Sequence, residues 1–165
     1  MSFIFNIFVK NPLLMSLTPS KINTFLIFKL PSAYLCGVRV KILENQKCIT
    51  TVKHKWINQN PFKSLFWAVQ GMAAELSTGA IIINKVKESE KNIAMLLVKN
   101  EASYSKKATG RIYFECNEGS LIDSAIEEAI NSGEGKEVTL SVLGKNSESV
   151  EVSRFSFTWS LKVRS

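Results

Sequence analysis

The stretch "NQNPFKSLFWAVQGMAAELSTG", residues 58–79, carries the main evidence for the fold of this chain. Asn60 stands before Pro61, and an Asn at the N-cap followed by Pro in the first turn is a common start of an α-helix. Apolar residues then recur every three or four positions, which places them on one helix face. A glycine commonly follows the last turn of a helix, so Gly79 is expected to end this one. The pattern predicts a long, largely buried helix over about residues 61–79.

Outside this stretch, the hydrophobic period changes from helical spacing to alternation. "GVRVKI" (37–42) and "CITTVKHK" (48–55) predict the two arms of a β-hairpin. Four further runs predict strands: "NIAMLLVKN" (92–100), "TGRIYFECNE" (109–118), "KEVTLSVLG" (136–144) and "ESVEVSRFSFTWSLKV" (148–163). In the last run the alternation slips at Ser153–Arg154, which predicts a β-bulge.

Two more helices are predicted at either side of this pattern. "PSKINTFLIFKLP" (19–31) has helical spacing, with Thr18 or Ser20 as the cap and a stop before Pro31. A second short helix is expected over about 120–132, where Ser120 and Asp123 resemble a capping box. Six strands with mostly hairpin connections form an antiparallel sheet, and the long apolar helix must pack against it. The fold class is therefore α+β.

The length of 165 residues fits one domain, which we place at residues 16–165. Residues 1–15 read as an N-terminal extension or an upstream start, since Met15 is a plausible second start. The apolar opening is a poor signal peptide, because Asn6 and Lys10 interrupt it and no basic region precedes it. No apolar run approaches the roughly 18 residues of a membrane span.

A net charge of +7 favours anionic partners without naming one. Lys and Arg are scattered along the chain, so we do not expect nucleic acid, whereas a phosphate-bearing small molecule needs only two or three cations. The three cysteines lack the spacing of a metal site, and we expect free thiols in a reducing compartment, the cytoplasm.

The segment "LPSAYLCGVRVKI" (30–42), followed by the Asn60–Pro61–Phe62 entry into the long helix, resembles the DUF4442 family of thioesterase-like hot-dog proteins. The resemblance covers residues 16–163. It implies a curved antiparallel sheet wrapped around the long helix, and a homodimer or a dimer of dimers. It also implies an acyl-CoA or acyl-carrier thioester as substrate or ligand, without a metal or redox cofactor.

Thioester hydrolysis needs a polarised carbonyl group and a positioned water. The backbone amides of Phe62, Lys63 and Ser64, at the expected helix start, are candidates for holding the thioester oxygen as it becomes charged. Asn60 could cap the helix or orient the water. The resemblance implies an acid about two turns into the helix, but this chain has Gln70 and Gly71 there. Gln70 could hold the thioester or a water by hydrogen bonds.

Glu75 is the lone acid of the stretch and the candidate general base. Ser64, Ala68, Gly71 and Glu75 are spaced by 4, 3 and 4, so they form a stripe opposite the apolar face, and partial burial there could raise the pKa of Glu75. Against this, Glu75 lies about one turn beyond the acid of the family. It could instead cap a helix or form a salt bridge at a subunit interface.

Further residues are candidates for binding the substrate. Phe66, Trp67 and Gly71 could line an acyl tunnel, although packing explains the two aromatics equally well. The "SYSKKATG" turn and the following strand offer cations for nucleotide phosphates, at a place where the resemblance implies entry of the coenzyme A headgroup: Lys106, Lys107 and Arg111. A solvated turn explains these cations equally well. The resemblance, together with these candidate residues, implies an acyl-CoA thioesterase, a hydrolase. The alternative is a non-catalytic acyl-CoA-binding protein, which the missing acid favours, and an interaction module is a weaker third reading.

Overall fold

The computed structural model of this protein describes residues 17–164, so the predicted extension over residues 1–15 lies outside the described part of the chain. The helices are α2 (Pro19–Lys29), α3 (Pro31–Leu35), the short 3₁₀ helix η2 (Trp56–Asn58), α4 (Trp67–Glu88) and α5 (Gly119–Ser132). The strands are β1 (Arg39–Leu43), β2 (Cys48–Lys53), β3 (Ile93–Tyr104), β4 (Arg111–Cys116), β5 (Lys136–Asn146) and β6 (Glu151–Val163).

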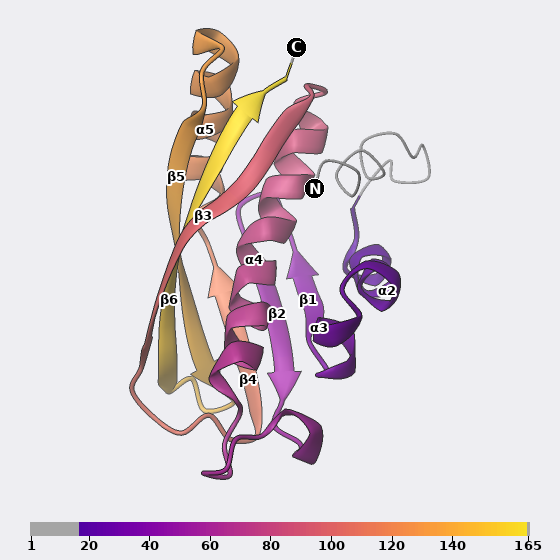
Figure 1. Ribbon diagram of the computed structural model, residues 1–165, viewed down its shortest axis with the longest axis vertical. Helices are drawn as coiled ribbons and strands as arrows, with labels where there is room; N and C mark the ends of the chain where they lie inside the picture. The colour runs from indigo at the N-terminus through magenta and orange to yellow at the C-terminus, as the bar shows by residue number, and fades with distance from the viewer. Residues whose placement is uncertain (1–16, 165) are drawn as a thin grey trace.

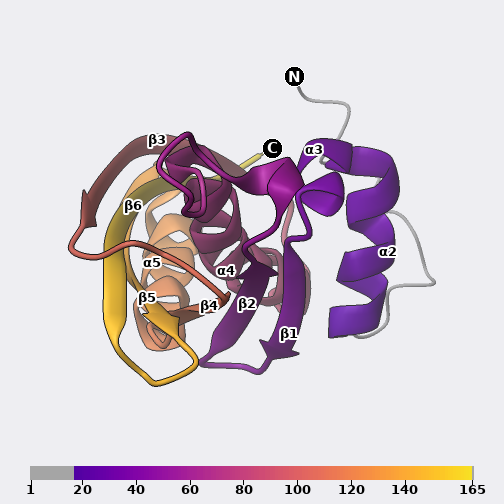
Figure 2. The same cartoon turned by 90° about the horizontal axis from the view of Figure 1, so that it is seen from below.

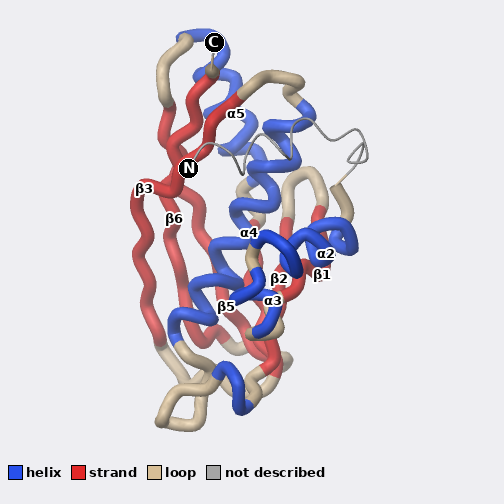
Figure 3. Tube along the Cα trace, turned by 45° about the vertical axis from the view of Figure 1, so that its right-hand side comes forward, coloured by secondary structure: helices blue, strands red, loops and turns tan. Residues whose placement is uncertain are grey.

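The six strands form one antiparallel sheet in the order β1-β2-β4-β5-β6-β3. The sheet curves around α4, which runs through its concave side (Figures 1 and 2). Fully buried Ile81 and Ile82 of α4 share one apolar core with Phe114, Leu140 and Leu161 of the strands. The predicted α+β class and the hot-dog arrangement are confirmed. The tube in Figure 3 shows α2 and α3 beside the β1 end of this layer.

Helix α4 differs from its predicted bounds at both ends, since it begins at Trp67 instead of residue 61 and ends at Glu88 instead of residue 79. Beyond Gly79, the apolar positions Ile81, Ile82 and Val86 are buried almost completely. Burying side chains of this size stabilises the helix by more than the roughly 1 kcal/mol that one internal glycine costs. Gly79 is therefore an interior position, and the predicted stop was wrong.

Local signals located the other helices well. Thr18 caps α2, because its Oγ1 accepts a hydrogen bond from the Lys21 amide at 3.3 Å, and the helix ends before Pro31 as expected. Gly133, at φ 69°, ends α5 in the left-handed region. The predicted capping box is wrong, however. Glu118 holds the N-cap position without a capping hydrogen bond from its side chain, and the Asp123 carboxylate turns toward α4.

One edge of the sheet is covered by helices, whereas the other is open within the described chain. On β1, the side chain of Asn23 makes both backbone hydrogen bonds of Val40, donating to its carbonyl at 2.9 Å and accepting from its amide at 2.8 Å. The Val38 amide donates to Ala33, so α2 and α3 occupy this edge. At the other edge, β3 pairs only with β6 within the described chain. Its Leu96 and Val98 are 55% and 44% exposed.

Strand β6 contains the predicted irregularity. Gly144 of β5 lies opposite Ser153, but the next residue, Lys145, lies opposite Glu151. Val152 is therefore the extra residue of a bulge, and Val152 and Ser153 are both buried. The change of phase comes one residue earlier than the alternation indicated.

Candidate ligand site at the start of helix α4

A closed loop centred on Asn60 delays the start of α4. The Asn60 Oδ1 atom accepts hydrogen bonds from the amides of Phe62 (3.0 Å) and Ser64 (3.2 Å). The Lys63 amide donates to the Asn60 carbonyl at 3.1 Å, and Lys63 has a positive φ of 57°. An Asn side chain that bonds to the backbone ahead of it favours a turn over a helix. Asn60 is a turn residue, and its predicted role as the N-cap of α4 was wrong.

This loop also changes which amides can receive a ligand. The amides of Phe62, Lys63 and Ser64 lie before the helix and all donate to Asn60, so they offer no free N–H group. The first amides of α4 are those of Trp67 and Ala68, for which the described chain provides no acceptor. A pair of free N–H groups at a helix start attracts a partial negative charge.

A cavity of about 380 Å³ lies beside this helix start. One wall comes from the loop and from α4: Asn60, Phe62, Ser64, Leu65, Trp67 and Gln70. The other wall comes from the end of β3 and the connection to β4: Tyr104, Ser105, Lys106, Lys107 and Ala108. The Leu65 amide donates to Ala108 at 2.8 Å, and Lys107 Nζ to the Phe62 carbonyl at 3.3 Å, which joins the walls.

Gln70 contributes a buried polar atom without a hydrogen-bond partner to the lining of the cavity. It is only 4% exposed, and its Nε2 donates to the Leu65 carbonyl at 3.2 Å, which fixes the amide plane. Its Oε1 is buried and accepts no hydrogen bond from the described residues. A buried acceptor without a donor costs about 1–3 kcal/mol, so a bound water or ligand that donates to this atom is favoured.

Glu75 lies in a different environment from Gln70. It lines a second, smaller cavity of about 80 Å³, surrounded by apolar side chains of α2, α4 and the sheet, among them Phe25, Ile83 and Trp159. Burial raises the pKa of Glu75 to about 7, as expected from its position. Within one chain, however, Glu75 does not line the cavity that holds Gln70.

The cavity contains Asn60, Phe62, Ser64, Trp67, Gln70, Lys106 and Lys107 among the residues selected from the sequence. It leaves out Lys63, Phe66, Gly71, Glu75 and Arg111. The Phe66 ring instead packs against Trp67, with centroids 5.5 Å apart, and Arg111 lies opposite Lys53 in the sheet. Tyr104 and Ser105 were missed, although they directly precede the selected lysines. The lysines of this turn were indicated by their charge and by the resemblance to hot-dog proteins, and neither signal points to an uncharged Tyr or Ser.

A curved antiparallel sheet around one long helix (Figure 1) is the hot-dog fold. Residues 20–161 match the DUF4442 family, a domain of unknown function, and the chain belongs to that family. No curated protein matches the sequence.

Solved structures with low sequence identity share the fold. A protein of unknown function from Pseudomonas aeruginosa, described as a probable thioesterase, is 17% identical, with a TM-score of 0.76 over 89% of this chain and 97% of its own. A protein of unknown function from Chlorobaculum tepidum is 16% identical, with a TM-score of 0.76 over 90% and 99%. A thioesterase from Haemophilus influenzae is 13% identical, with a TM-score of 0.69 over 90% and 92%.

Residues 17–164 lack two features, a membrane-spanning helix and a cluster of metal-binding side chains. None of the helices there combines the length and the apolar character needed to cross a membrane. No group of three or more His, Cys, Asp or Glu side chains in that range is arranged to hold a metal ion. The expectation of a reaction without a metal or redox cofactor stays a prediction.

Proposed function

We propose that this protein binds acyl thioesters in the cavity at the start of α4 and hydrolyses them, working in the cytoplasm as a homodimer or a dimer of dimers. The unpaired Oε1 of Gln70 carries the proposal, because it is a fixed, buried acceptor in a cavity that is also lined by Trp67, the first residue of α4. A buried acceptor in the cavity and the unpaired amides of the helix start next to it suit a water and a carbonyl oxygen, the two polar groups that meet in hydrolysis.

In this reaction, the thioester oxygen gains negative charge when water attacks the carbonyl carbon. The amides of Trp67 and Ala68 would donate to that oxygen, and Gln70 Oε1 would accept a hydrogen bond from the water and orient it, while the general base takes the proton. Asn60 is already engaged by its own loop, so it contributes the shape of the wall. The carbon–sulfur bond then breaks, and the thiolate leaves and is protonated.

The general base must come from outside the lining of this cavity, since no Asp or Glu is among its lining residues. Glu75 fits this role only if a second copy of the chain brings its own cavity to it. A carboxyl group with a pKa of about 7 is partly ionised at neutral pH, as a general base requires. We therefore keep Glu75 as the proposed base, acting across a dimer interface.

The open edge of β3 supports such a dimer. It is long, its Leu96 and Val98 are exposed, and nothing in the described chain covers its backbone. An apolar, unpaired edge strand is a template for pairing with another strand. Gly71 and Glu75 of α4 are half-buried in the single chain, and a second copy could complete their burial.

Lys106 and Lys107 at the other wall are exposed and fit the phosphate groups of a coenzyme A moiety. Neither forms an ion pair with another described residue, so their charges are available to an anionic ligand. Arg111 stays a weaker candidate, because it lies outside the lining. Phe62 and Trp67 give the cavity an apolar side, on which an acyl chain could lie.

A second function, acyl-CoA binding without hydrolysis, is favoured by one observation. The lining of the cavity contains amides, hydroxyls and lysines but no acid, so a single chain can hold a thioester without activating water. The two functions differ in whether Glu75 reaches the ligand.

Acyl-CoAs of short, medium and long chain, assayed with a thiol reagent and by calorimetry, test both functions. We expect saturable release of free coenzyme A, which Glu75→Gln abolishes while binding is kept. Glu137→Gln, an exposed carboxylate on β5, is the matched control and should leave turnover unchanged. Turnover that survives Glu75→Gln removes Glu75 from the mechanism. Tight binding without turnover supports the second function, and no binding to any chain length contradicts both.

A further inference from the structure

Two connections meet at the lower end of the molecule in Figure 1, the end that faces the viewer in Figure 2. One is the β2–α4 connection, residues 54–66, which includes η2. The other is the β3–β4 connection, residues 105–110. The His54 amide donates to Gly110 at 2.7 Å and the Leu65 amide to Ala108 at 2.8 Å, so the two connections form one continuous surface.

This surface is strongly basic. The sequence has no Asp or Glu in residues 45–74 or 102–114. Six exposed cations lie on or beside the two connections: Lys53, Lys55, Lys63, Lys106, Lys107 and Arg111. None of the six forms an ion pair within the described chain. Two acids lie nearby, Glu148 in the β5–β6 turn and Glu151 at the start of β6. Glu151 forms an ion pair with Arg154 at 2.9 Å, so the net charge of this surface stays positive.

Large apolar side chains project from the same connections. Trp56 is 84% exposed, Phe62 72% and Ile57 55%. The buried Asn58 holds η2 in place, donating to the carbonyls of Cys36 (2.8 Å) and Lys53 (2.9 Å). Trp56 and Ile57 are therefore held in solvent by a fixed turn, where large apolar groups gain nothing unless something covers them.

We propose that this basic loop surface, formed by the six cations and by Trp56, Ile57 and Phe62, docks on an anionic lipid bilayer. The lysines and the arginine would face the lipid phosphates, and the three apolar side chains would enter the headgroup region. Aromatic and aliphatic groups flanked by lysines fit a bilayer interface, which is wet on one side and apolar on the other. A nucleic acid would use the cations but has no apolar layer for Ile57.

The location of this surface connects docking to the cavity at the start of α4. Phe62, Lys106 and Lys107 belong both to the cavity lining and to the basic loop surface. A ligand that partitions into lipid would therefore meet the mouth of the cavity where the protein touches the bilayer. Docking itself does not require hydrolysis, and its test is independent of any turnover.

Vesicle co-sedimentation of the full chain tests the proposal at low salt. We expect binding to vesicles that contain phosphatidylcholine and phosphatidylglycerol and much weaker binding to phosphatidylcholine alone. Replacing Lys53 and Lys55 together by Ala should weaken binding about 25-fold, because each lysine near an anionic surface contributes about fivefold. Trp56→Ser should weaken it by about tenfold or more, since the indole no longer enters the interface.

The matched controls lie away from these connections and outside the cavity. Lys91, between α4 and β3, and Lys162 of β6 are exposed lysines without an ion pair among the described residues, and their joint replacement by Ala should change binding less than threefold, as should Leu121→Ser on α5. Thermal melts establish that each variant is folded. The proposal is overturned if the control and test lysine variants lose vesicle binding equally, or if the protein does not bind the anionic vesicles. Binding to short DNA or RNA duplexes in place of vesicles would also overturn it. If Trp56→Ser leaves vesicle binding unchanged, the insertion of apolar side chains into the headgroup region is overturned.

Discussion

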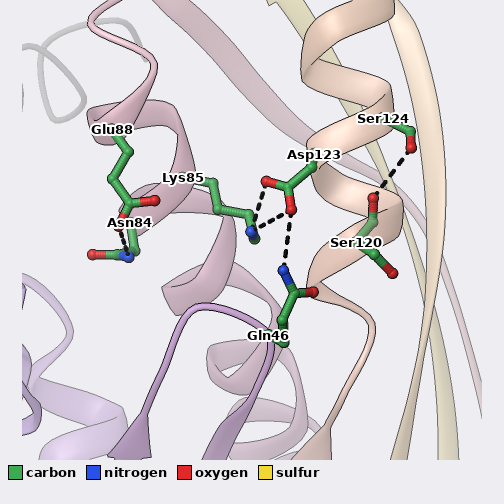
Figure 4. Close-up of polar contacts among 7 residues, drawn as sticks. All are labelled: Gln46, Asn84, Lys85, Glu88, Ser120, Asp123 and Ser124. Carbon is green, nitrogen blue, oxygen red and sulfur yellow. Dashed lines mark hydrogen bonds and ion pairs between the residues drawn. The ribbon is translucent and has the colours of Figure 1, made fainter.

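Lys85 Nζ lies 2.6 Å and 2.7 Å from the two carboxylate oxygens of Asp123, so one ion pair joins α4 to α5 (Figure 4). The Lys85 side chain is 3% exposed and that of Asp123 is 52% exposed. Gln46 donates to the same carboxylate at 3.2 Å, which adds the β1–β2 turn to the contact. Gly119 allows this turn to come close, because a Cβ there would lie 2.6 Å from the Asn45 carbonyl oxygen.

Removing the carboxylate should destabilise the protein. Asp123→Ala leaves the Lys85 cation buried without its partner, and we expect a loss of about 2–4 kcal/mol in the free energy of unfolding, measured by urea denaturation. Lys85→Met should lower the free energy of unfolding by less than Asp123→Ala does, because it leaves no buried charge. In the exposed pair Lys99–Glu101, Glu101→Ala should cost below about 1 kcal/mol. Equal losses for Asp123→Ala and Glu101→Ala would contradict this view of the pair.

Gln70 should matter for catalysis more than for stability. Gln70→Ala removes the acceptor proposed to orient the water, and we expect kcat for acyl-CoA hydrolysis to fall by roughly 10²-fold with a smaller change in KM. The exposed Gln59, in the same connection but outside the cavity, provides the control Gln59→Ala. A kcat that falls equally in both variants would show that Gln70 has no specific part in the reaction.

The raised pKa of Glu75 predicts how stability depends on pH. Between about pH 4.5 and 7 the unfolded chain releases this proton while the folded chain retains it, so the free energy of unfolding falls as pH rises through that window. The loss is at most about 3 kcal/mol. Glu75→Gln should therefore raise the melting temperature at pH 8 and leave it nearly unchanged at pH 4. The same increase at both pH values would contradict an ionisable, buried Glu75.

If Glu75 is also the general base, activity should follow the opposite trend. The carboxylate form increases as pH rises through about 7, so kcat should rise over the same window. A rate profile that is flat from pH 6 to 8, measured where the protein stays folded, would separate the ionisation of Glu75 from the reaction.

The open β3 edge predicts the oligomeric state. We expect a dimer by size-exclusion chromatography with light scattering, and monomers for Leu96→Lys and Val98→Lys, because charged residues on an edge strand oppose pairing. Glu137→Lys, on the exposed side of a central strand, should leave the mass unchanged. Monomeric wild-type protein would refute the proposed dimer, as would dimers that persist in both β3 variants.

Local patterns were sufficient for most of the fold. Alternation located all six strands, although β3 continues to Tyr104 instead of ending at residue 100, and it located the bulge of β6 to within one residue. Thr18 and Gly133 marked the ends of two helices correctly. These features depend on neighbours in sequence, which a pattern can show.

The failures arose where distant residues decide between two local options. Asn60 before Pro61 suits a helix start and a turn equally well, and the turn is fixed by the hydrogen bond from Leu65 to Ala108. Asp123 could cap α5, but the buried Lys85 of α4 binds it instead. For the site, the sequence indicated Gln70 and Lys107 separately, whereas only the fold shows that they line one cavity.

Asn23 has a consequence for how large an assembly built by strand addition can become. By satisfying both backbone groups of Val40, it blocks the β1 border of the sheet, and only the β3 border can accept another strand. When two copies pair through identical edge strands, the contact occupies the single free edge of each molecule. No free edge is left for a third copy. Growth into a fibre needs two free borders per molecule, so this one asparagine makes such pairing self-limiting.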